Sequence, residues 1–217
     1  MRSIVDVSLQ EKPHILAIQE ADISSFWNGR FNHIDYLAAN SGFNHTIQGE
    51  HVDGLALKYG TSILSRLELY NKNSHTFSVS PLTFPKGFVI STVKWPDIPE
   101  IEIDIISVHL DFLFESTRQQ QVEELINSVK NRNRPIILMG DFNNEWQEDG
   151  NALDYLINSL ALKAYKPEYQ KLVTYPRLNK RYDWILVSQE FDFVSYAILP
   201  DKISDHRAVI AELTLVE

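Results

Sequence analysis

The sequence predicts an α/β protein in which stacked β-sheets are flanked by helices. Short apolar runs typical of buried strands recur along the 217 residues. Segments with helical periodicity are fewer, and the two kinds of segment alternate without a linker, a low-complexity tract or a detectable repeat. Periodicity alone leaves a second arrangement open, a single doubly wound sheet with helices on both faces.

The strands are expected where apolar runs end at turn-forming residues. They are expected at 14–19, 61–66, 88–95, 101–109, 136–140, 182–187, 193–198 and 208–215. Between 88–95 and 101–109 lies a short segment that contains Pro96 and Pro99. That spacing predicts a β-hairpin.

The helices are expected where apolar residues recur every three or four positions. The sets with this spacing are Val5 and Leu9; Phe31, Ile34, Leu37 and Ala38; Val122, Leu125, Ile126 and Val129; and Leu153, Leu156, Ile157 and Leu160. The first helix should cover residues 1–12, because Pro13 ends it. Ser116 and Gln119 have the spacing of a capping box at the start of the third helix.

Length and composition are consistent with one domain over residues 1–217 and a substantial core, since 44% of the residues are hydrophobic. No apolar stretch approaches the roughly 20 residues that span a bilayer. The N-terminus has no apolar segment of the signal-peptide type. The chain contains no cysteine, which excludes disulfides, thiolate nucleophiles and Cys-type zinc sites. We therefore expect a cytoplasmic protein with no membrane span.

The charge balance limits the class of partner. With 20 basic and 29 acidic residues the net charge is −9, which argues against a broad grip on duplex DNA. A small phosphodiester or a locally held nucleic acid stays open. Basic residues gather before the 182–187 strand, at Lys163, Lys166, Lys171, Arg177, Lys180 and Arg181. This segment is either a solvated loop or part of a substrate site.

Polar groups with catalytic chemistry stand at the ends of several predicted strands. The clearest case is Ile136–Met139, which is followed by Gly140, Asp141 and Asn143. Such a junction is also an ordinary turn. The pattern recurs, however, at Gln19-Glu20, Ser107-Val108-His109, Tyr182-Asp183 and Ser204-Asp205-His206. The recurrence favours a site at the rim of a sheet.

These residues resemble the motifs of the endonuclease/exonuclease/phosphatase superfamily, which has the deoxyribonuclease I-like fold. The motifs are Gln19-Glu20, Ser107-Val108-His109-Leu110, Gly140-Asp141-Phe142-Asn143, Tyr182-Asp183-Trp184-Ile185 and Ser204-Asp205-His206, with Tyr59–Arg66 and Thr174-Tyr175-Pro176 as further matches. The resemblance covers the whole chain. It implies a four-layer α/β sandwich of two packed, mostly antiparallel sheets flanked by helices.

The resemblance also implies the roles of the site residues. Glu20 would bind Mg²⁺ or Mn²⁺, and Asp205 the metal or its waters. Asp141 would activate the attacking water, and Asn143 would hold Asp141 or a phosphate oxygen. His109 and His206 would donate to phosphate oxygens, with Asp183 fixing His206. Arg177, Lys180 or Arg181 would face the phosphate of the substrate. The implied activity is metal-dependent phosphoester hydrolysis, without an obligate protein partner.

Three alternatives stay open within this reading. The first is a phosphomonoesterase or lipid phosphatase in place of a phosphodiesterase or nuclease. The second is a catalytically impaired binding module, because family members generally begin with a strand that ends in a metal-binding Asn. Here residues 1–12 match the following helix, so we expect roughly 20–25 residues of the pattern to be missing. The third is another metal site at His45, Glu50, His51 and Asp53. The remaining histidines, His14, His33 and His75, belong to no comparable motif.

Overall fold

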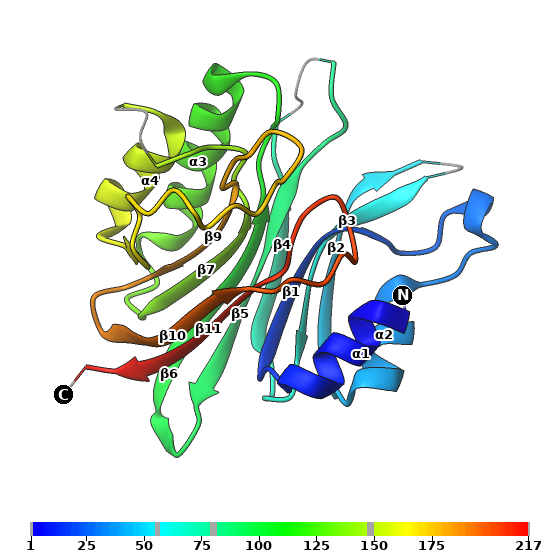
Figure 1. The fold of residues 1–217 in the computed structure, drawn as a ribbon, viewed down its shortest axis with the longest axis horizontal. Helices are drawn as coiled ribbons and strands as arrows, with labels where there is room; N and C mark the ends of the chain where they lie inside the picture. Colours follow the sequence, from blue (N-terminus) through cyan, green and yellow to red (C-terminus); the bar gives the residue numbers. More distant parts are fainter. Residues whose placement is uncertain (1, 55–56, 79–81, 147–149, 217) are drawn as a thin grey trace. The chain divides into compact units, whose positions relative to one another are not determined.

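The computed structural model describes residues 2–54, 57–78, 82–146 and 150–216. The chain forms two compact units, Met1–His109 and Leu110–Glu217, each with its own strands and helices (Figure 1). In the part of the chain that the structure describes, no helix combines the length and the apolar character that a bilayer crossing needs.

The first unit contains two antiparallel groups of strands. One is a three-stranded sheet in the order β1-β3-β2, formed by β1 (Ile15–Asp22), β3 (Lys58–Ser65) and β2 (His45–Asp53). In the other, β5 (Gly87–Trp95) pairs with both β4 (Tyr70–Thr76) and β6 (Ile98–His109). The two groups pack face to face, and β2 approaches β5 closely at Gly49. A Cβ at this glycine would lie 2.7 Å from Val89 Cγ1, so a side chain there would separate the sheets.

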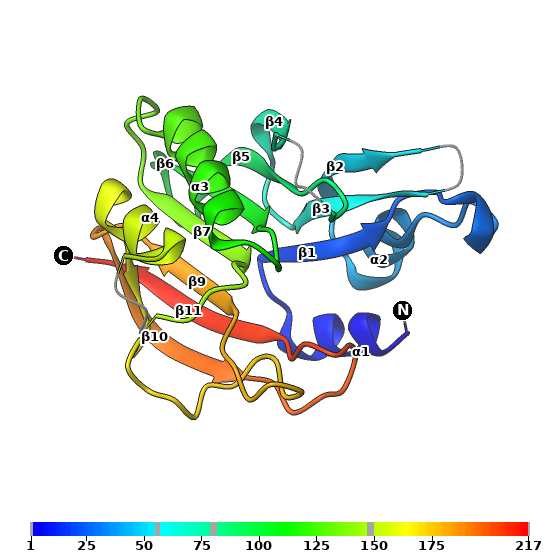
Figure 2. The ribbon, with the colours of Figure 1, turned by 90° about the horizontal axis from the view of Figure 1, so that it is seen from above.

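Helices α1 (Arg2–Glu11) and α2 (His33–Ser41) accompany the β1-β3-β2 sheet, and a short 3₁₀ helix, η1 (Phe26–Asn28), precedes α2 (Figures 1 and 2). Asn32 caps α2, because its side chain accepts hydrogen bonds from the backbone N–H groups of Ile34 and Asp35. Ile34 and Leu37 of α2 are fully buried against the sheet, together with Leu64 of β3. Ile4 and Val5 of α1 pack against the same cluster.

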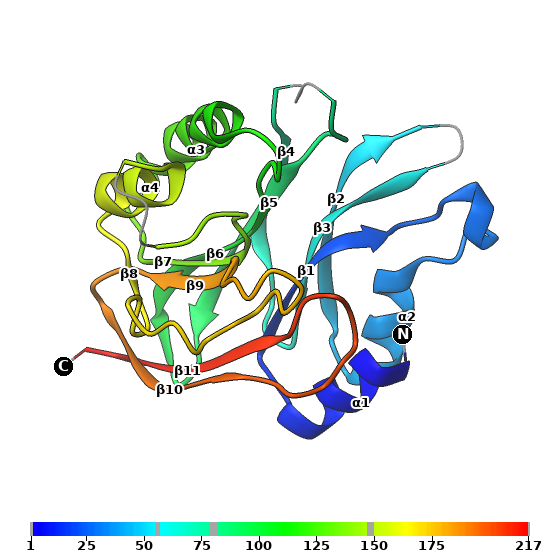
Figure 3. The ribbon, with the colours of Figure 1, turned by 45° about the horizontal axis from the view of Figure 1, so that its top comes forward.

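The second unit combines a small sheet, a hairpin and two helices. Strand β9 (Asp183–Val187) pairs antiparallel with β7 (Ile136–Asp141) and with the short β8 (Lys163–Ala164). Strands β10 (Phe191–Ile198) and β11 (Val209–Leu215) form an antiparallel hairpin. Helices α3 (Glu115–Val129) and α4 (Ala152–Leu160) lie side by side (Figures 2 and 3). Glu115 links them, since its Oε1 accepts from the Ala152 backbone N–H at 2.6 Å.

The predicted helices and strands are confirmed, with shifts of a few residues at their ends. The hairpin predicted around Pro96 and Pro99 is β5–β6, and the helix predicted at residues 1–12 is α1. The capping box at Ser116 and Gln119 is wrong: α3 already begins at Glu115, after Phe114. Asp111 instead orders the turn before the helix, because its Oδ1 accepts from the backbone N–H groups of Leu113 and Phe114. Strands β2, β4 and β8 were not predicted.

Candidate functional site

The candidate site residues form one cluster in each unit. In the first unit, β1 delivers Glu20 and the end of β6 delivers His109. In the second unit, Asp141 ends β7, Asp183 begins β9, and His206 precedes β11. These positions agree with the expectation that strand ends carry the site.

A bulge in β1 presents Glu20. The register between β1 and β3 shifts between Ile18 and Ala21, and Glu20 has a left-handed backbone conformation with φ of 53°. A non-glycine residue rarely adopts this conformation without a functional or structural reason. The carboxylate is 61% exposed. Next to it in sequence, Gln19 Nε2 donates to Ser107 Oγ at 3.1 Å and ties β1 to β6.

A buried lysine holds Glu20 and His109 together. Lys86 is only 4% exposed, and its Nζ lies 3.0 Å from Glu20 Oε1 and 3.4 Å from His109 Nδ1. His109 Nδ1 lies 3.9 Å from the same carboxylate oxygen. Sequence reasoning missed Lys86, because a single lysine before an apolar strand resembles an ordinary strand-flanking charge. The ammonium gives this cluster a fixed positive charge next to the predicted metal ligand.

In the second unit, Asp183 and His206 form the shortest contact of the cluster. His206 Nδ1 lies 2.7 Å from Asp183 Oδ2, and His206 Nε2 lies 3.9 Å from Asp141 Oδ2. Burial alone would lower the pKa of His206. The hydrogen bond to Asp183 and the charges of Asp183, Asp141 and Asp205 outweigh burial and raise the pKa to about 9. His206 is therefore an imidazolium at neutral pH, able to donate from both ring nitrogens.

The turn after β7 fixes Asp141. Asn143 has φ of 50°, a left-handed conformation that is common for asparagine in turns, and it lies just after the end of β7. The backbone N–H of Asn143 donates to Asp141 Oδ1 at 2.9 Å. Asn143 Nδ2 donates to the Leu110 carbonyl at 3.1 Å, which engages the amide with the protein backbone. One hydrogen-bonded oxygen holds the carboxylate in place while Oδ2 faces His206.

The segment from Thr174 to Arg181 lies beside this cluster. Tyr175 pairs with Lys180 in an antiparallel bridge, and the Tyr175 ring lies 4.7 Å from the ring of His206. Thr174 Oγ1 accepts from the backbone N–H of Asp183 at 3.1 Å. Sequence reasoning did not assign Tyr175 a role, although it lies in the matched Thr-Tyr-Pro motif. Its ring covers one face of the imidazole.

The three predicted substrate-binding cations differ in their surroundings. Arg177 is exposed, and Lys180 forms an ion pair with Glu145. Arg181 is 6% exposed and stacks over Trp184, with its Cζ 3.8 Å from the ring centroid. Its terminal nitrogens donate to the carbonyls of Tyr165 and Lys166 and to Tyr196 Oη. Arg181 is thus anchored inside the second unit, whereas Arg177 is exposed to solvent.

The oxygen donors fit a hard divalent cation. Asp141, Asp183 and His206 are the one group among the described residues whose ligand atoms lie close enough to share an ion, within 4.8 Å of one another. Asp141 and Asp183 contribute carboxylate oxygens, and His206 contributes a ring nitrogen. Carboxylates suit Mg²⁺ and Mn²⁺. The second unit offers a further exposed carboxylate at Asp205, and the first unit offers one at Glu20. A cation at Glu20 would share the carboxylate with the Lys86 ammonium.

The alternative metal site around His45 and His51 is wrong for the described residues, since no such group gathers there. His51 is buried and bonds through its two ring nitrogens to Thr76 Oγ1 at 3.1 Å and Thr61 Oγ1 at 2.7 Å. Burial, with smaller contributions from His75 and Lys86, lowers its pKa to about 4. His51 is a neutral histidine of the core of the first unit.

Comparison with known proteins gives a consistent result. A model described as the Endonuclease/Exonuclease/phosphatase family matches residues 1–206. The fold is similar to the human nocturnin catalytic domain, solved with a bound sulfate anion, at 19% identity and a TM-score of 0.79, covering 99% of this chain and 86% of that chain. Curated protein sequences give no match.

Two proteins of Bacteroides thetaiotaomicron are similar to the same extent. A mannosyl-6-phosphatase matches at 18% identity and a TM-score of 0.75, covering 98% of this chain and 90% of that chain. A protein described by the family name alone matches at 18% identity and a TM-score of 0.79, covering 99% and 88%. At these identities the likeness shows the fold, a mixed α/β arrangement of sheets flanked by helices.

Proposed function

Because this chain belongs to the endonuclease/exonuclease/phosphatase family, we propose that it is a divalent-metal-dependent phosphoesterase that hydrolyses a phosphodiester. The family consists of hydrolases that act on phosphoester bonds. The observation that carries the proposal is the arrangement of Asp183, His206 and Asp141, in which one imidazole lies between two carboxylates.

Each of these residues has a chemical task. Asp183 holds the His206 ring through Nδ1, which leaves Nε2–H free to donate to a non-bridging phosphate oxygen. Asp141 would accept the proton of the attacking water, with its Oδ1 held by the backbone N–H of Asn143. Asn143 positions Asp141 through that backbone bond. The role predicted for the Asn143 side chain, contact with a phosphate oxygen, competes with its bond to the Leu110 carbonyl.

The proposed metal ligands are Glu20 in the first unit and Asp205 in the second, and Mg²⁺ or Mn²⁺ is the proposed ion. When bound, the ion would neutralise phosphate charge and assist departure of the leaving oxygen. Lys86 holds the Glu20 carboxylate and His109 in one cluster. His109 would donate to a phosphate oxygen, and Arg177, which is exposed, would attract the substrate.

A phosphomonoester is the second candidate substrate, because a protein of similar fold is a mannosyl-6-phosphatase. The net charge of −9 favours a small or single-stranded substrate over duplex DNA in either case. A binding module without turnover is the candidate from another functional class.

Hydrolysis of four substrates in Mg²⁺ separates these candidates. We expect cleavage of bis(p-nitrophenyl) phosphate to exceed that of p-nitrophenyl phosphate, and single-stranded oligonucleotides to exceed plasmid DNA. His206→Ala, purified in the same way, is the negative control for contaminating nucleases, and EDTA tests the requirement for metal. A preference for the monoester would support the phosphatase reading. Substrate binding without turnover of any of the four would refute the enzyme proposal.

A further inference from the structure

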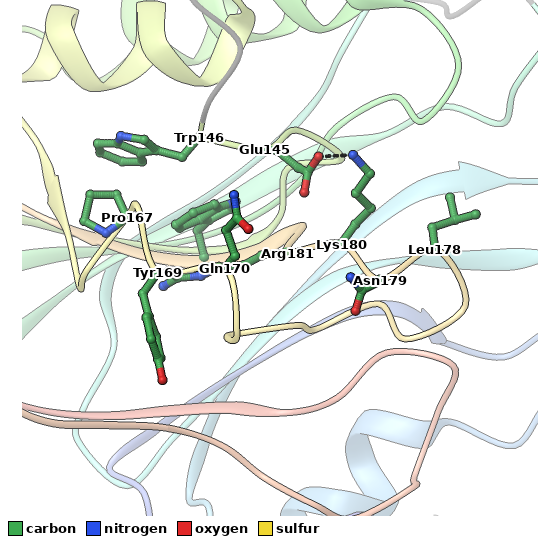
Figure 4. A pocket seen from close by; sticks show the side chains of 10 residues that line it. Glu145, Trp146, Pro167, Tyr169, Gln170, Leu178, Asn179, Lys180 and Arg181 are labelled. Carbon is green, nitrogen blue, oxygen red and sulfur yellow. Dashed lines mark hydrogen bonds and ion pairs between the residues drawn. The ribbon is translucent and has the colours of Figure 1, made fainter.

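The second unit contains a pocket of about 300 Å³, a size typical of sites for small ligands. None of Asp141, Asp183 and His206 lines it. Its walls are Glu145, Trp146, Pro167, Tyr169, Gln170, Leu178, Asn179, Lys180, Arg181 and Trp184. Figure 4 shows Trp146, Pro167 and Tyr169 along one side and the Lys180–Glu145 pair toward the other.

Aromatic rings dominate one side of the pocket. Trp146 packs against the buried Trp184 with ring centroids 5.7 Å apart, and this contact holds the Trp146 ring in place. Tyr169 also lines the pocket and is 48% exposed, so its ring is accessible to a ligand. Flat, partly exposed aromatic faces bind ligands that are themselves flat.

Arg181 is part of the wall but offers no donor to the pocket. The residue is 6% exposed, and its two terminal nitrogens are engaged with Tyr165, Lys166 and Tyr196. Its Nε has no hydrogen-bond partner but is covered by protein, so a ligand does not reach it. The guanidinium therefore cannot form the paired hydrogen bonds by which arginine holds a phosphate.

The other polar groups favour an uncharged ligand. Lys180 is neutralised by Glu145. Asn179 contributes a side-chain amide that both donates and accepts. A neutral ring with a carbonyl or ring-nitrogen acceptor on its edge meets these conditions. A sugar carries several hydroxyl groups, and each of them needs a hydrogen-bond partner when it is buried.

We propose that this pocket binds a nucleobase, stacked on Trp146 and Tyr169 and hydrogen-bonded at its edge by the side-chain amide of Asn179. As a statement about the substrate it rests on the proposed phosphoesterase function, and it makes that substrate a nucleotide or a single-stranded nucleic acid.

The pocket lies beside the Asp183–His206 pair. Lys180, one of its walls, pairs with Tyr175, and the Tyr175 ring lies 4.7 Å from the ring of His206. Trp184 directly follows Asp183 in β9, so the two side chains leave opposite faces of the strand. A bound nucleotide would pass the start of β9, with its base against Trp146 and its phosphate toward Asp183.

Direct binding tests the proposal without turnover. Isothermal titration calorimetry with adenosine, cytidine and uridine, in EDTA, should give saturable binding by at least one nucleoside, and ribose should not bind. Tyr169→Ala and Trp146→Ala should each weaken binding at least about tenfold, whereas Tyr169→Phe should keep it. Tyr155→Ala is the matched control, because Tyr155 is 47% exposed on α4 and does not line the pocket.

Equal binding of ribose, unchanged binding in Tyr169→Ala, or no binding of any nucleoside would overturn the pocket assignment. The exposed Tyr169 keeps the test valid if Trp146→Ala fails to fold. Hydrolysis of phosphodiesters without nucleoside binding would refute the pocket and leave the proposed function standing. Nucleoside binding without hydrolysis of any ester would refute the proposed function and leave the pocket assignment standing.

Discussion

Asp183 and His206 form a hydrogen bond of 2.7 Å between Oδ2 and Nδ1, although they are 23 residues apart in the sequence. Asp183 begins β9, and His206 stands in the loop before β11. The bond fixes Nδ1 as the protonated nitrogen that faces Asp183. Nε2 is then directed toward Asp141 at 3.9 Å. One contact thus sets both the charge and the orientation of the imidazole.

If the pair acts as one unit, losing either member should cost nearly as much as losing both. We expect Asp183→Asn and His206→Ala each to lower kcat by a factor on the order of 10²–10⁴, and the double variant to be little worse. Steady-state kinetics on bis(p-nitrophenyl) phosphate measure this. His14→Ala, at an exposed histidine, is the control. Fully additive losses would show that the two residues act separately.

The pKa values of two histidines should lie on opposite sides of the ordinary 6.5. His206 should titrate near 9 and His51 near 4. A raised pKa means that His206 stabilises the fold fully below about 6.5, and that this contribution is lost as the pH rises through about 9. For His51 the folded state resists protonation, so its contribution is lost as the pH falls from about 6.5 to 4.

NMR titration of the imidazole resonances in metal-free buffer checks both values. Asp183→Asn should move the His206 titration toward lower pH and leave His51 unchanged. If both histidines titrated near 6.5, the hydrogen-bonded and buried environments described for them would be incorrect.

Metal binding should depend on Glu20 and be opposed by Lys86. EDTA should abolish activity, and Glu20→Gln should raise the metal concentration required for activity at least about tenfold. Lys86→Met should strengthen binding at Glu20, because it removes an ammonium 3.0 Å from the carboxylate. Electron paramagnetic resonance of Mn²⁺ measures affinity independently of turnover. Unchanged turnover in EDTA would exclude the proposed chemistry.

Sequence reasoning located the strand ends that carry Glu20, Asp141 and Asp183 because apolar runs that stop at acids are visible locally. Strand β4 was missed because its residues are polar and mostly exposed, which removes the alternation that marks a strand. Lys86 was missed for a different reason: its partners Glu20 and His109 are brought to it only by tertiary folding. Local patterns predict which residue types reach a rim, and the fold decides which of them pair.

The exposed cation of the 174–181 segment should affect substrate binding more than catalysis. Arg177→Glu should raise KM more than it lowers kcat, because an exposed charge attracts the phosphate without contacting the reacting atoms. The effect should shrink at high ionic strength. Lys171→Glu reverses the charge of another exposed residue of the basic segment and is the matched control. An equal rise in KM for both variants would indicate only a general charge effect.

Arg181 should behave as a structural residue in stability measurements. Its guanidinium stacks over Trp184 at 3.8 Å and over Tyr196 at 5.1 Å, and its terminal nitrogens hold the Tyr165 carbonyl. Arg181→Met keeps much of the side-chain volume but leaves that carbonyl and Tyr196 Oη without their donor. We expect a loss of about 2–4 kcal/mol in the free energy of unfolding, measured by urea denaturation. Arg177→Met, which removes an exposed arginine four residues earlier, should change it by less than about 0.5 kcal/mol. Equal stability of the two variants would mean that the buried contacts of Arg181 contribute nothing to folding.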